Sequence, residues 1–367
     1  MRRPLWNLRS GQRIALRRVV VAVALLTVPA PVRAESPAKT HVDAGLRHVE
    51  AGRADEAFAE AQQGIAADPG SADAYDVLGA AHYLRHEYEA ALAAHRRASE
   101  LAPGSSDPHD NMVPSYWALG RNDDALREAR MALTLEPDCG HCRISLASTL
   151  YRLGRYDEAA AESRTALRTA PEAPDAQYVL GATLVKLDDA RSAIAPLRAC
   201  IRLATPEQRA LADECRYLLG SAHLKVGEPR PAEDIFRRLV EDEPDGTRAR
   251  VGLADALVSQ SRFADAAVEL ETAVRTTPTS SWISYRLGVV YGRLRRSADA
   301  VTQLEASVAG DPSNAFAVAA LVRAYAAAGR VDDAAARYEA LKKLDPTLAA
   351  RIGGGSESCK AQNDPEA

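Results

Sequence analysis

Residues 140–173 read GHCRISLASTLYRLGRYDEAAAESRTALRTAPEA, and this stretch holds the pattern that decides the fold. Leu146 and Leu150 recur at the spacing of one helix face, and Gly154 follows where a left-handed backbone can end that helix. A second helical stretch then continues until Pro171, which cannot extend it. The stretch therefore predicts two short helices joined by a tight turn.

The same pattern returns along the chain at a constant interval, which is the distance from Pro137 to Pro171. Prolines at this interval are Pro69, Pro103, Pro137 and Pro171, and then Pro244, Pro278, Pro312 and Pro346. A row of alanines keeps the same interval at every step except the longer one from Ala193 to Ala232, and it comprises Ala57, Ala91, Ala125, Ala159, Ala193, Ala232, Ala266, Ala300 and Ala334. One helical pair cannot bury its own apolar stripe, whereas stacked pairs bury it between neighbours. The period therefore predicts a stack of helical pairs.

Two further residue sets keep the same register. Leu-Gly pairs occur at Leu78-Gly79, Leu180-Gly181, Leu219-Gly220 and Leu287-Gly288, and turn glycines occur at Gly120, Gly154, Gly227 and Gly329. With these offsets the sequence resembles tetratricopeptide repeats, and nine repeats start near residues 38, 72, 106, 140, 174, 213, 247, 281 and 315. The resemblance implies an all-α fold, a right-handed α-solenoid of stacked helix-turn-helix repeats over residues 35–352, with a concave face.

Repeat 5 departs from the period because it carries an insertion. Thr205-Pro206-Glu207-Gln208 within this insertion is typical of a capping box with proline at the first helical position. We therefore expect the first helix of repeat 6 to start early. At the end of the array we expect a last capping turn over residues 347–352, followed by a disordered tail over residues 353–367.

Residues 1–34 differ in composition from the rest of the chain. They contain seven arginines, no acidic residue and an apolar stretch from Val19 to Val28, and Val32-Arg33-Ala34 matches a cleavage site. We interpret residues 1–34 as a secretory signal peptide, so that the mature chain is periplasmic or secreted and has no integral membrane span. An uncleaved membrane anchor is the alternative, although the apolar stretch is about half the ~20 residues that a span needs.

The charge that remains after cleavage restricts the partners. The 46 basic residues fall to 39 without those seven arginines, which against 50 acidic residues leaves a net charge of −11. An acidic chain is a poor non-specific ligand for nucleic acid or anionic membranes. We therefore expect a protein or peptide partner and no nucleic acid.

The chain has five cysteines, and an exported chain meets an oxidising compartment in which disulfides form. Cys139-Gly140-His141-Cys142 is similar to the redox centre of protein disulfide isomerases, but it lies on the linker into repeat 4 with no strand pattern nearby. A structural disulfide, a spare thiol pair and redox catalysis are the alternatives here. Cys200 and Cys215 flank the insertion and are either a disulfide or two buried apolar side chains.

In the family that these repeats resemble, certain first-helix positions line the concave face. The aromatic residues at these positions include Tyr83, Trp117, Tyr151, Tyr178, Tyr217, Trp282 and Tyr285. The basic residues include Arg152, Lys186, Lys225, Arg286 and Arg293, whereas the early repeats carry Asp73, Asp76, Asp107 and Asp110. We expect these side chains to form a partner-binding groove that is acidic at its start and basic later. Partial burial of the aromatic side chains between helices is the alternative.

Motifs for catalysis and cofactor binding are not found in the sequence. There is no phosphate loop, nucleophile elbow or zinc-protease motif. His82 and His86 have metal-ligand spacing on one helix, but packing explains His82 because it stands at a tyrosine position of the repeat. We therefore expect no metal, no cofactor and no catalytic residue, and hence a non-catalytic interaction scaffold of the cell envelope. The alternatives are a module that self-associates through its end repeats, and a thiol-disulfide exchange protein using Cys139 and Cys142.

Overall fold

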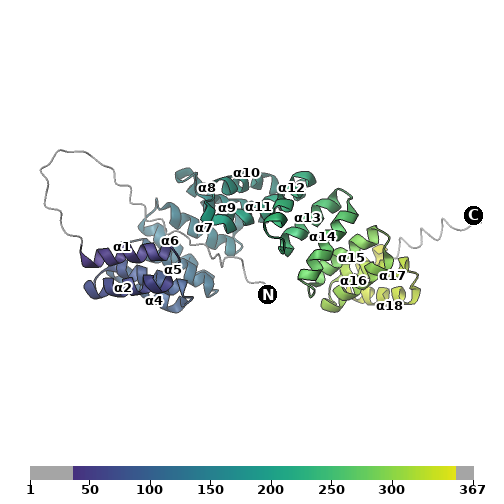
Figure 1. Ribbon diagram of the computed structural model, residues 1–367, viewed down its shortest axis with the longest axis horizontal. Coiled ribbons are helices and arrows are strands. Elements are labelled where there is room, and N and C mark those ends of the chain that lie inside the picture. Colours follow the sequence, from purple (N-terminus) through teal and green to yellow (C-terminus); the bar gives the residue numbers. More distant parts are fainter. Residues whose placement is uncertain (1–35, 353–367) are drawn as a thin grey trace, which may run out of the picture. The chain divides into compact units, whose positions relative to one another are not determined.

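The computed structural model describes residues 36–352, which fall into two compact units divided between Cys215 and Arg216 (Figure 1). The signal peptide and the tail predicted at the two ends lie outside the described residues. All regular structure in the described part is helical, as the repeats predict, and no strand occurs there. Unit 1 covers the described residues up to 215, and unit 2 covers those from 216.

The helices alternate along the chain as the first and second members of successive repeats. Those of unit 1 are α1 (Pro37–Glu50), α2 (Ala54–Ala67), α3 (Ala72–Leu84), α4 (Tyr88–Leu101), α5 (Asp107–Ala118), α6 (Asn122–Leu135), α7 (Gly140–Arg152), α8 (Tyr156–Thr169), α9 (Pro174–Lys186), α10 (Ala190–Leu203) and the 3-10 turn η1 (Pro206–Gln208). Helix α11 (Arg209–Lys225) spans the division, and unit 2 continues with α12 (Pro229–Asp242), α13 (Thr247–Ser259), α14 (Phe263–Thr276), α15 (Ser281–Arg293), α16 (Ser297–Gly310), α17 (Ala315–Ala327) and α18 (Val331–Leu344). Residues 346–352 form a further helical turn.

Within each unit the first helices lie along one face. In unit 1 each first helix from α1 to α7 contacts the next one, up to α9, as well as its own partner, and in unit 2 α15 contacts α17 in the same way. We call the surface built by these helices the first-helix face of each unit. Each unit is thus an α-solenoid, in which a partner would meet side chains from several repeats on this face.

Small side chains allow the two helices of a repeat to approach closely. Every alanine of the periodic row is buried, and all but Ala334 are fully so. The glycine of each Leu-Gly pair meets a large side chain of the second helix. A Cβ atom on Gly181 would lie 2.6 Å from Leu197, and one on Gly288 would lie 2.5 Å from Leu304. These glycines are therefore required by packing rather than by backbone conformation.

The turn between the two helices has one conformation in all nine repeats. One residue of this turn has a positive φ, which the sequence indicates where that residue is glycine. Four repeats place another residue there, namely His86, Asp188, Ser261 and Arg295, with φ between 58° and 63°. The stacked helices on both sides of the turn impose this conformation, because only a left-handed residue reverses the chain so sharply.

The insertion in repeat 5 starts the next helix early, as expected from the capping box. The backbone N–H of Thr205 donates to Oε1 of Gln208 at 3.2 Å. The turn η1 leads directly into α11, which begins at Arg209 and has 17 residues. A disulfide between Cys200 and Cys215 then joins α10 to α11 across the insertion.

Candidate functional site

The aromatic row of unit 1 is built into the contacts between repeats. Tyr83, Trp117 and Tyr151 come from α3, α5 and α7, and all three side chains are half-buried. Trp117 Nε1 donates to Oγ1 of Thr149 at 3.1 Å, and Arg152 donates from Nη2 to the carbonyl oxygen of Trp117 at 3.4 Å. The Arg152 guanidinium also lies 5.5 Å from the centre of the indole ring. Trp117 therefore holds α5 against α7.

The two tyrosines of this row pack within their own repeats. Tyr83 lies 5.7 Å from Tyr88, and Tyr151 lies 5.7 Å from Tyr156, each partner standing at the start of the second helix of that repeat. Burial raises the pKa of the Tyr83 hydroxyl, and Tyr88 raises it further. Tyr83 therefore remains a neutral donor at physiological pH.

A small cavity of about 30 Å³ opens beside Trp117. Ser148, Asp175 and Tyr178 contribute to its lining, and a cavity of this size holds a water molecule rather than a side chain. Tyr178 is only 9 % exposed, so the expectation that it stands on the groove surface is wrong. At this position of the repeat the side chain points between neighbouring first helices, where a tyrosine fills space.

The early carboxylates divide into exposed and buried ones. Asp73 is exposed, whereas Asp76 is mostly buried and bonds Nδ1 of His95 at 2.9 Å. Burial raises the pKa of Asp76 and likewise that of Asp110. The acidic start of the expected groove is therefore partly inside the repeat stack, which lowers the charge that a partner meets there.

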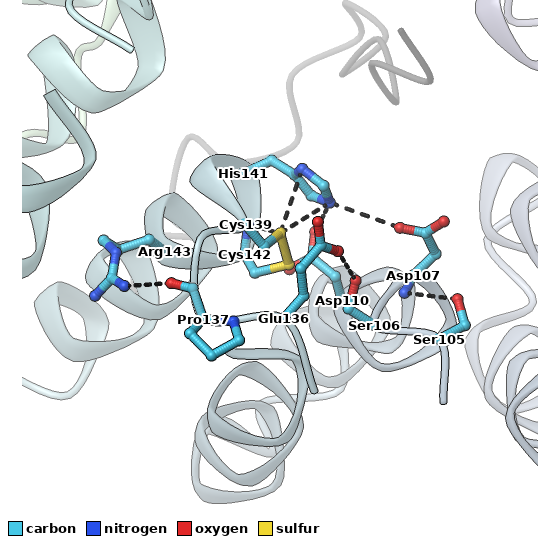
Figure 2. Close-up of a disulfide and its surroundings, with 10 residues drawn as sticks. All are labelled: Ser105, Ser106, Asp107, Asp110, Glu136, Pro137, Cys139, His141, Cys142 and Arg143. Atoms are coloured by element: carbon cyan, nitrogen blue, oxygen red, sulfur yellow. Dashed lines mark hydrogen bonds and ion pairs between the residues drawn. A yellow bond between two sulfur atoms is a disulfide. The ribbon is translucent and has the colours of Figure 1, made fainter. Parts of the chain in front are cut away.

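The Cys139–Cys142 disulfide stands at the start of α7 with His141 over it (Figure 2). Cys139 is the residue before the helix, and its Sγ accepts a hydrogen bond from the backbone N–H of Cys142 at 3.1 Å. His141 Nε2 lies 3.3 Å from that Sγ and 3.8 Å from Oδ1 of Asp107. Interaction with Asp107 raises the pKa of the His141 imidazole, and Asp110 raises it further.

The Cys139–Cys142 pair differs from a thiol-disulfide exchange centre in its burial. Cys139 is 3 % exposed and Cys142 is fully buried, whereas the cysteines of exchange centres are partly exposed. The pair follows a turn after α6 rather than a strand, unlike the redox motif that its four letters resemble. Cys200 and Cys215 are fully buried as well, and their disulfide closes the insertion.

The first-helix face of unit 2 exposes two of its aromatic residues. Trp282 at the start of α15 is 43 % exposed, and Phe316 at the start of α17 is 64 % exposed. The Arg286 guanidinium lies 4.5 Å from the centre of the Trp282 ring and forms an ion pair with Asp255 of α13. Trp282 is thus held from one side by a cation and is open on the other. Tyr285 is half-buried against the apolar core.

The remaining groove residues also differ between the units. Lys186 in unit 1 and Lys225 and Arg293 in unit 2 are exposed. Tyr217 is half-buried in unit 2, where the Arg248 guanidinium lies 3.5 Å from its ring centre and Phe236 meets its ring edge-on at 5.6 Å. Sequence reasoning missed Arg248. It follows Tyr217 at the same sequence separation at which Arg286 follows Asp255, so the repeat period could have indicated it.

Comparison with known proteins identifies the repeat. A family model described as tetratricopeptide repeat matches residues 111–164, 144–207, 217–281 and 285–349, which together cover more than half of the chain. No curated protein is similar enough to match the sequence. In the described part of the chain, no helix combines the length and apolarity needed to cross a bilayer.

Several solved structures share the fold at low sequence identity. The Cut9–Hcn1 hetero-tetramer of the APC/C is 18 % identical with a TM-score of 0.58, over 76 % of this chain and 55 % of that one. PilF of Pseudomonas aeruginosa is 16 % identical with a TM-score of 0.51, over 58 % of this chain and 95 % of that one. YrrB, a TPR protein with an unusual peptide-binding site, is 20 % identical with a TM-score of 0.44, over 52 % of this chain and 95 % of that one. The first two likenesses support the stacked-repeat fold.

Proposed function

This chain belongs to the tetratricopeptide repeat family, and from that premise we propose that it is a non-catalytic scaffold that binds a peptide or helical segment of another protein on its first-helix face. The observation that carries the proposal is the exposure of Trp282 and Phe316 at the starts of two consecutive first helices. Exposed aromatic side chains are the commonest anchors of protein interfaces. A lone exposed Leu would need no such explanation, but two large rings on one face do.

The charges around these rings indicate the chemistry of the partner. Arg286 contacts the Trp282 ring, and Arg293 is exposed at the end of the same helix. A segment with an apolar side chain followed by a carboxylate would meet a ring first and a base afterwards. We therefore propose a partner segment that combines apolar and acidic residues.

Peptide display against the full mature chain tests this proposal. Selected peptides should combine apolar and acidic residues, and they should bind Trp282→Ala at least tenfold more weakly, which corresponds to about 1.4 kcal/mol. Val331→Ala is the matched control, because Val331 is 70 % exposed but lies on a second helix. Equal affinity for Trp282→Ala and the wild type would contradict the proposed face.

We also propose that the chain works outside the cytoplasm. Support comes from the arginine-rich leader with its Val32-Arg33-Ala34 site and from two buried disulfides, which are typical of oxidising compartments. N-terminal sequencing of exported material should give Glu35 as the first residue. Recovery of residues 1–34 in the membrane fraction would contradict cleavage.

Self-association through the end repeats is a second candidate function. The observation that favours it is that α18, the second helix of the last repeat, exposes Val331 and Leu344. Light scattering over a concentration series tests it, and a constant monomer mass would exclude it. For the third candidate, thiol-disulfide exchange, an oxidoreductase assay on Cys139→Ser with Cys142→Ser is decisive, since loss of a measurable activity would overturn the non-catalytic assignment.

A further inference from the structure

The side chains around the Cys139–Cys142 disulfide are of metal-ligating types. The sulfurs of Cys139 and Cys142 and a ring nitrogen of His141 all lie within 4.8 Å of one another. They form the only such group among residues 36–352. Two cysteines separated by two residues are the commonest half of a zinc site, because this spacing lets both sulfurs face one ion at a chain turn. Here the two Cα atoms are 5.4 Å apart.

A carboxylate from the preceding repeat lies beside this group, next to His141. Asp110 of α5 reaches to 3.9 Å from Nε2 of His141 with Oδ2. The side chain is only 14 % exposed, and although the carboxylate interacts with Ser145, its other oxygen, Oδ1, is buried without a hydrogen bond. A buried carboxylate oxygen without a partner needs an explanation, and a cation beside it would supply one. Figure 2 shows His141 beside the sulfurs, with the carboxylate of Asp107 on its other side.

We propose that, when its disulfide is reduced, the chain binds one Zn²⁺-class divalent cation through Cys139, Cys142, His141 and Asp110. The four ligands are two sulfurs, one imidazole nitrogen and one carboxylate oxygen, a set that suits a tetrahedral, borderline-soft ion. Asp107 is 47 % exposed on its side chain and lies across His141 from the sulfurs as a partner for the imidazole.

The chemistry balances if a dithiol acts as the reductant. Transfer of two electrons and two protons from the dithiol breaks the Sγ–Sγ bond, so that the dithiol becomes a disulfide and Cys139 and Cys142 become thiols. Binding of the cation then displaces both thiol protons to solvent, and two Sγ–metal bonds form. The disulfide and the metal site are thus alternative states of the same two sulfurs. Either state ties the start of α7 in place, but only the metal state would also tie it to α5.

The second disulfide lacks this surrounding and serves as the internal control. Cys200 and Cys215 are fully buried, and no histidine or carboxylate group joins them in a potential metal cluster within the described residues. After reduction they should remain two buried thiols. We therefore expect that, after both disulfides of one protein are reduced, only Cys139 and Cys142 bind the cation.

Cobalt binding by the full mature chain tests the proposal. A Cys359→Ser background removes the remaining thiol, the protein is reduced with dithiothreitol, and the reductant is removed without oxygen before Co²⁺ is added. We expect one Co²⁺ per reduced chain, with the visible absorption of tetrahedral thiolate coordination, and none in the oxidised chain. Zn²⁺ should displace the Co²⁺. Cys200→Ser with Cys215→Ser should bind like the reduced parent, whereas Cys139→Ser with Cys142→Ser should not bind.

Two single variants test the other ligands. Asp110→Asn and His141→Ala should each weaken Co²⁺ binding by at least about tenfold, the loss typical even of outer-shell partners. Unchanged affinity in Asp110→Asn would overturn the assignment of the fourth ligand. Circular dichroism establishes that each variant retains its helices.

A protection experiment keeps the proposal testable if the double cysteine variants fail to fold. In the reduced parent, Zn²⁺ should slow alkylation of Cys139 and Cys142 but not of Cys200 and Cys215, as mapped by mass spectrometry. Equal alkylation rates with and without Zn²⁺, or Co²⁺ uptake by the oxidised chain, would overturn the site.

Discussion

The two units bury their repeats differently. In unit 2 one apolar cluster runs from Ala232 to Ala349, whereas the early repeats of unit 1 form separate clusters, one ending at Ala81 and the next starting at Leu92. His95 lies in the space between these two, 1 % exposed and bonded to Asp76.

The residue that corresponds to His95 in repeat 6 is Phe236, which is fully buried. Each ring fills the space over the glycine of the Leu-Gly pair in its own repeat, since a Cβ atom would lie 2.5 Å from His95 at Gly79 and 2.7 Å from Phe236 at Gly220. The repeat therefore specifies the volume at this position but not its polarity. A polar group can enter the stack where a neighbour satisfies it, as Asp76 does for His95 in unit 1.

The largest expected effect is a loss of stability when the buried Phe236 ring is removed. Phe236→Ala should lower the free energy of unfolding by about 3–5 kcal/mol, because the ring contacts both Gly220 and Gly252 and no nearby side chain can replace it. Urea unfolding followed by helical circular dichroism measures the loss, and hydrogen exchange locates it in α12 and α13. Phe316→Ala removes the same chemistry from a site that is 64 % exposed and should change stability by less than about 0.5 kcal/mol. Similar losses in the two variants would contradict the packing described for Phe236.

For the buried His95–Asp76 pair we expect a smaller loss of stability, which a second substitution should reverse. His95→Leu should destabilise unit 1 by about 1–3 kcal/mol, because it leaves the Asp76 carboxylate buried without its partner. Adding Asp76→Val should recover most of the loss, because it copies repeat 7, where Val251 and Leu270 occupy these positions. A double-mutant cycle measures the coupling, and additive effects would show that His95 and Asp76 do not act as a pair.

The stability of the His95→Leu variant should depend on pH in a defined direction. Burial holds the pKa of Asp76 above its ordinary value, so the folded state binds this proton more tightly than the unfolded state. The contribution of Asp76 to stability therefore decreases as the pH rises through its raised pKa. Removing His95 leaves that charge less compensated, so the deficit of His95→Leu should shrink as the pH is lowered through the same range. Unfolding midpoints measured from mildly acidic to neutral pH test this.

Much of the fold could be predicted from the sequence, because the residues that recur with the repeat are those that helix packing and the turn require. The alanine row marks close contacts between helices and the turn glycines mark the left-handed turn, so helix pairs and register could be predicted, and the capping box predicted the early start of α11. The four positive-φ residues that are not glycine could not, since the stack rather than the residue imposes that conformation. Tyr178 was placed wrongly because two neighbouring first helices decide whether its position is open or closed, and a single repeat does not contain that information.

The site was harder to predict because its contacts join side chains of different repeats. Asp110 and His141 belong to repeats 3 and 4, and Trp117 and Thr149 likewise. Positions on a family's concave face indicate which residues share a surface. They do not indicate which of those residues satisfy one another. Whether a charge or ring on that face is available to a partner depends on the cross-repeat neighbour, and only the structure shows this.

Partner binding should separate the two first-helix faces. Trp282→Ala should weaken partner binding more than tenfold, or about 1.4 kcal/mol, with little change in stability, because its ring is already exposed. Trp117→Ala should weaken binding as well but also lower stability, since it loses the bond to Thr149 and the contact with Arg152. Titration and thermal unfolding of both variants distinguish these outcomes. Wild-type binding by Trp117→Ala with full helicity would show that the aromatic row of unit 1 is core rather than contact surface.

The smallest expected effect is on the rate of partner association, and it comes from the exposed basic residues of the two first-helix faces. Lys186 ends α9 in unit 1 and Arg293 ends α15 in unit 2, and both are exposed on first helices. Exposed charges contribute about 0.2–1 kcal/mol to a contact and mainly accelerate encounter, because water and salt screen them. Lys186→Ala and Arg293→Ala should therefore slow association by less than about tenfold, and the effect should be larger at low salt, where the screening length grows. Replacement of Arg293 should slow association more than replacement of Lys186, because the Arg293 guanidinium lies 5.9 Å from the Phe263 ring, which holds it in place before binding.

Lys343→Ala removes an equal charge from a second helix and is the control. Stopped-flow association at two salt concentrations measures all three variants, and equal slowing by Lys343→Ala would mean that the partner responds to net charge rather than to the first-helix face.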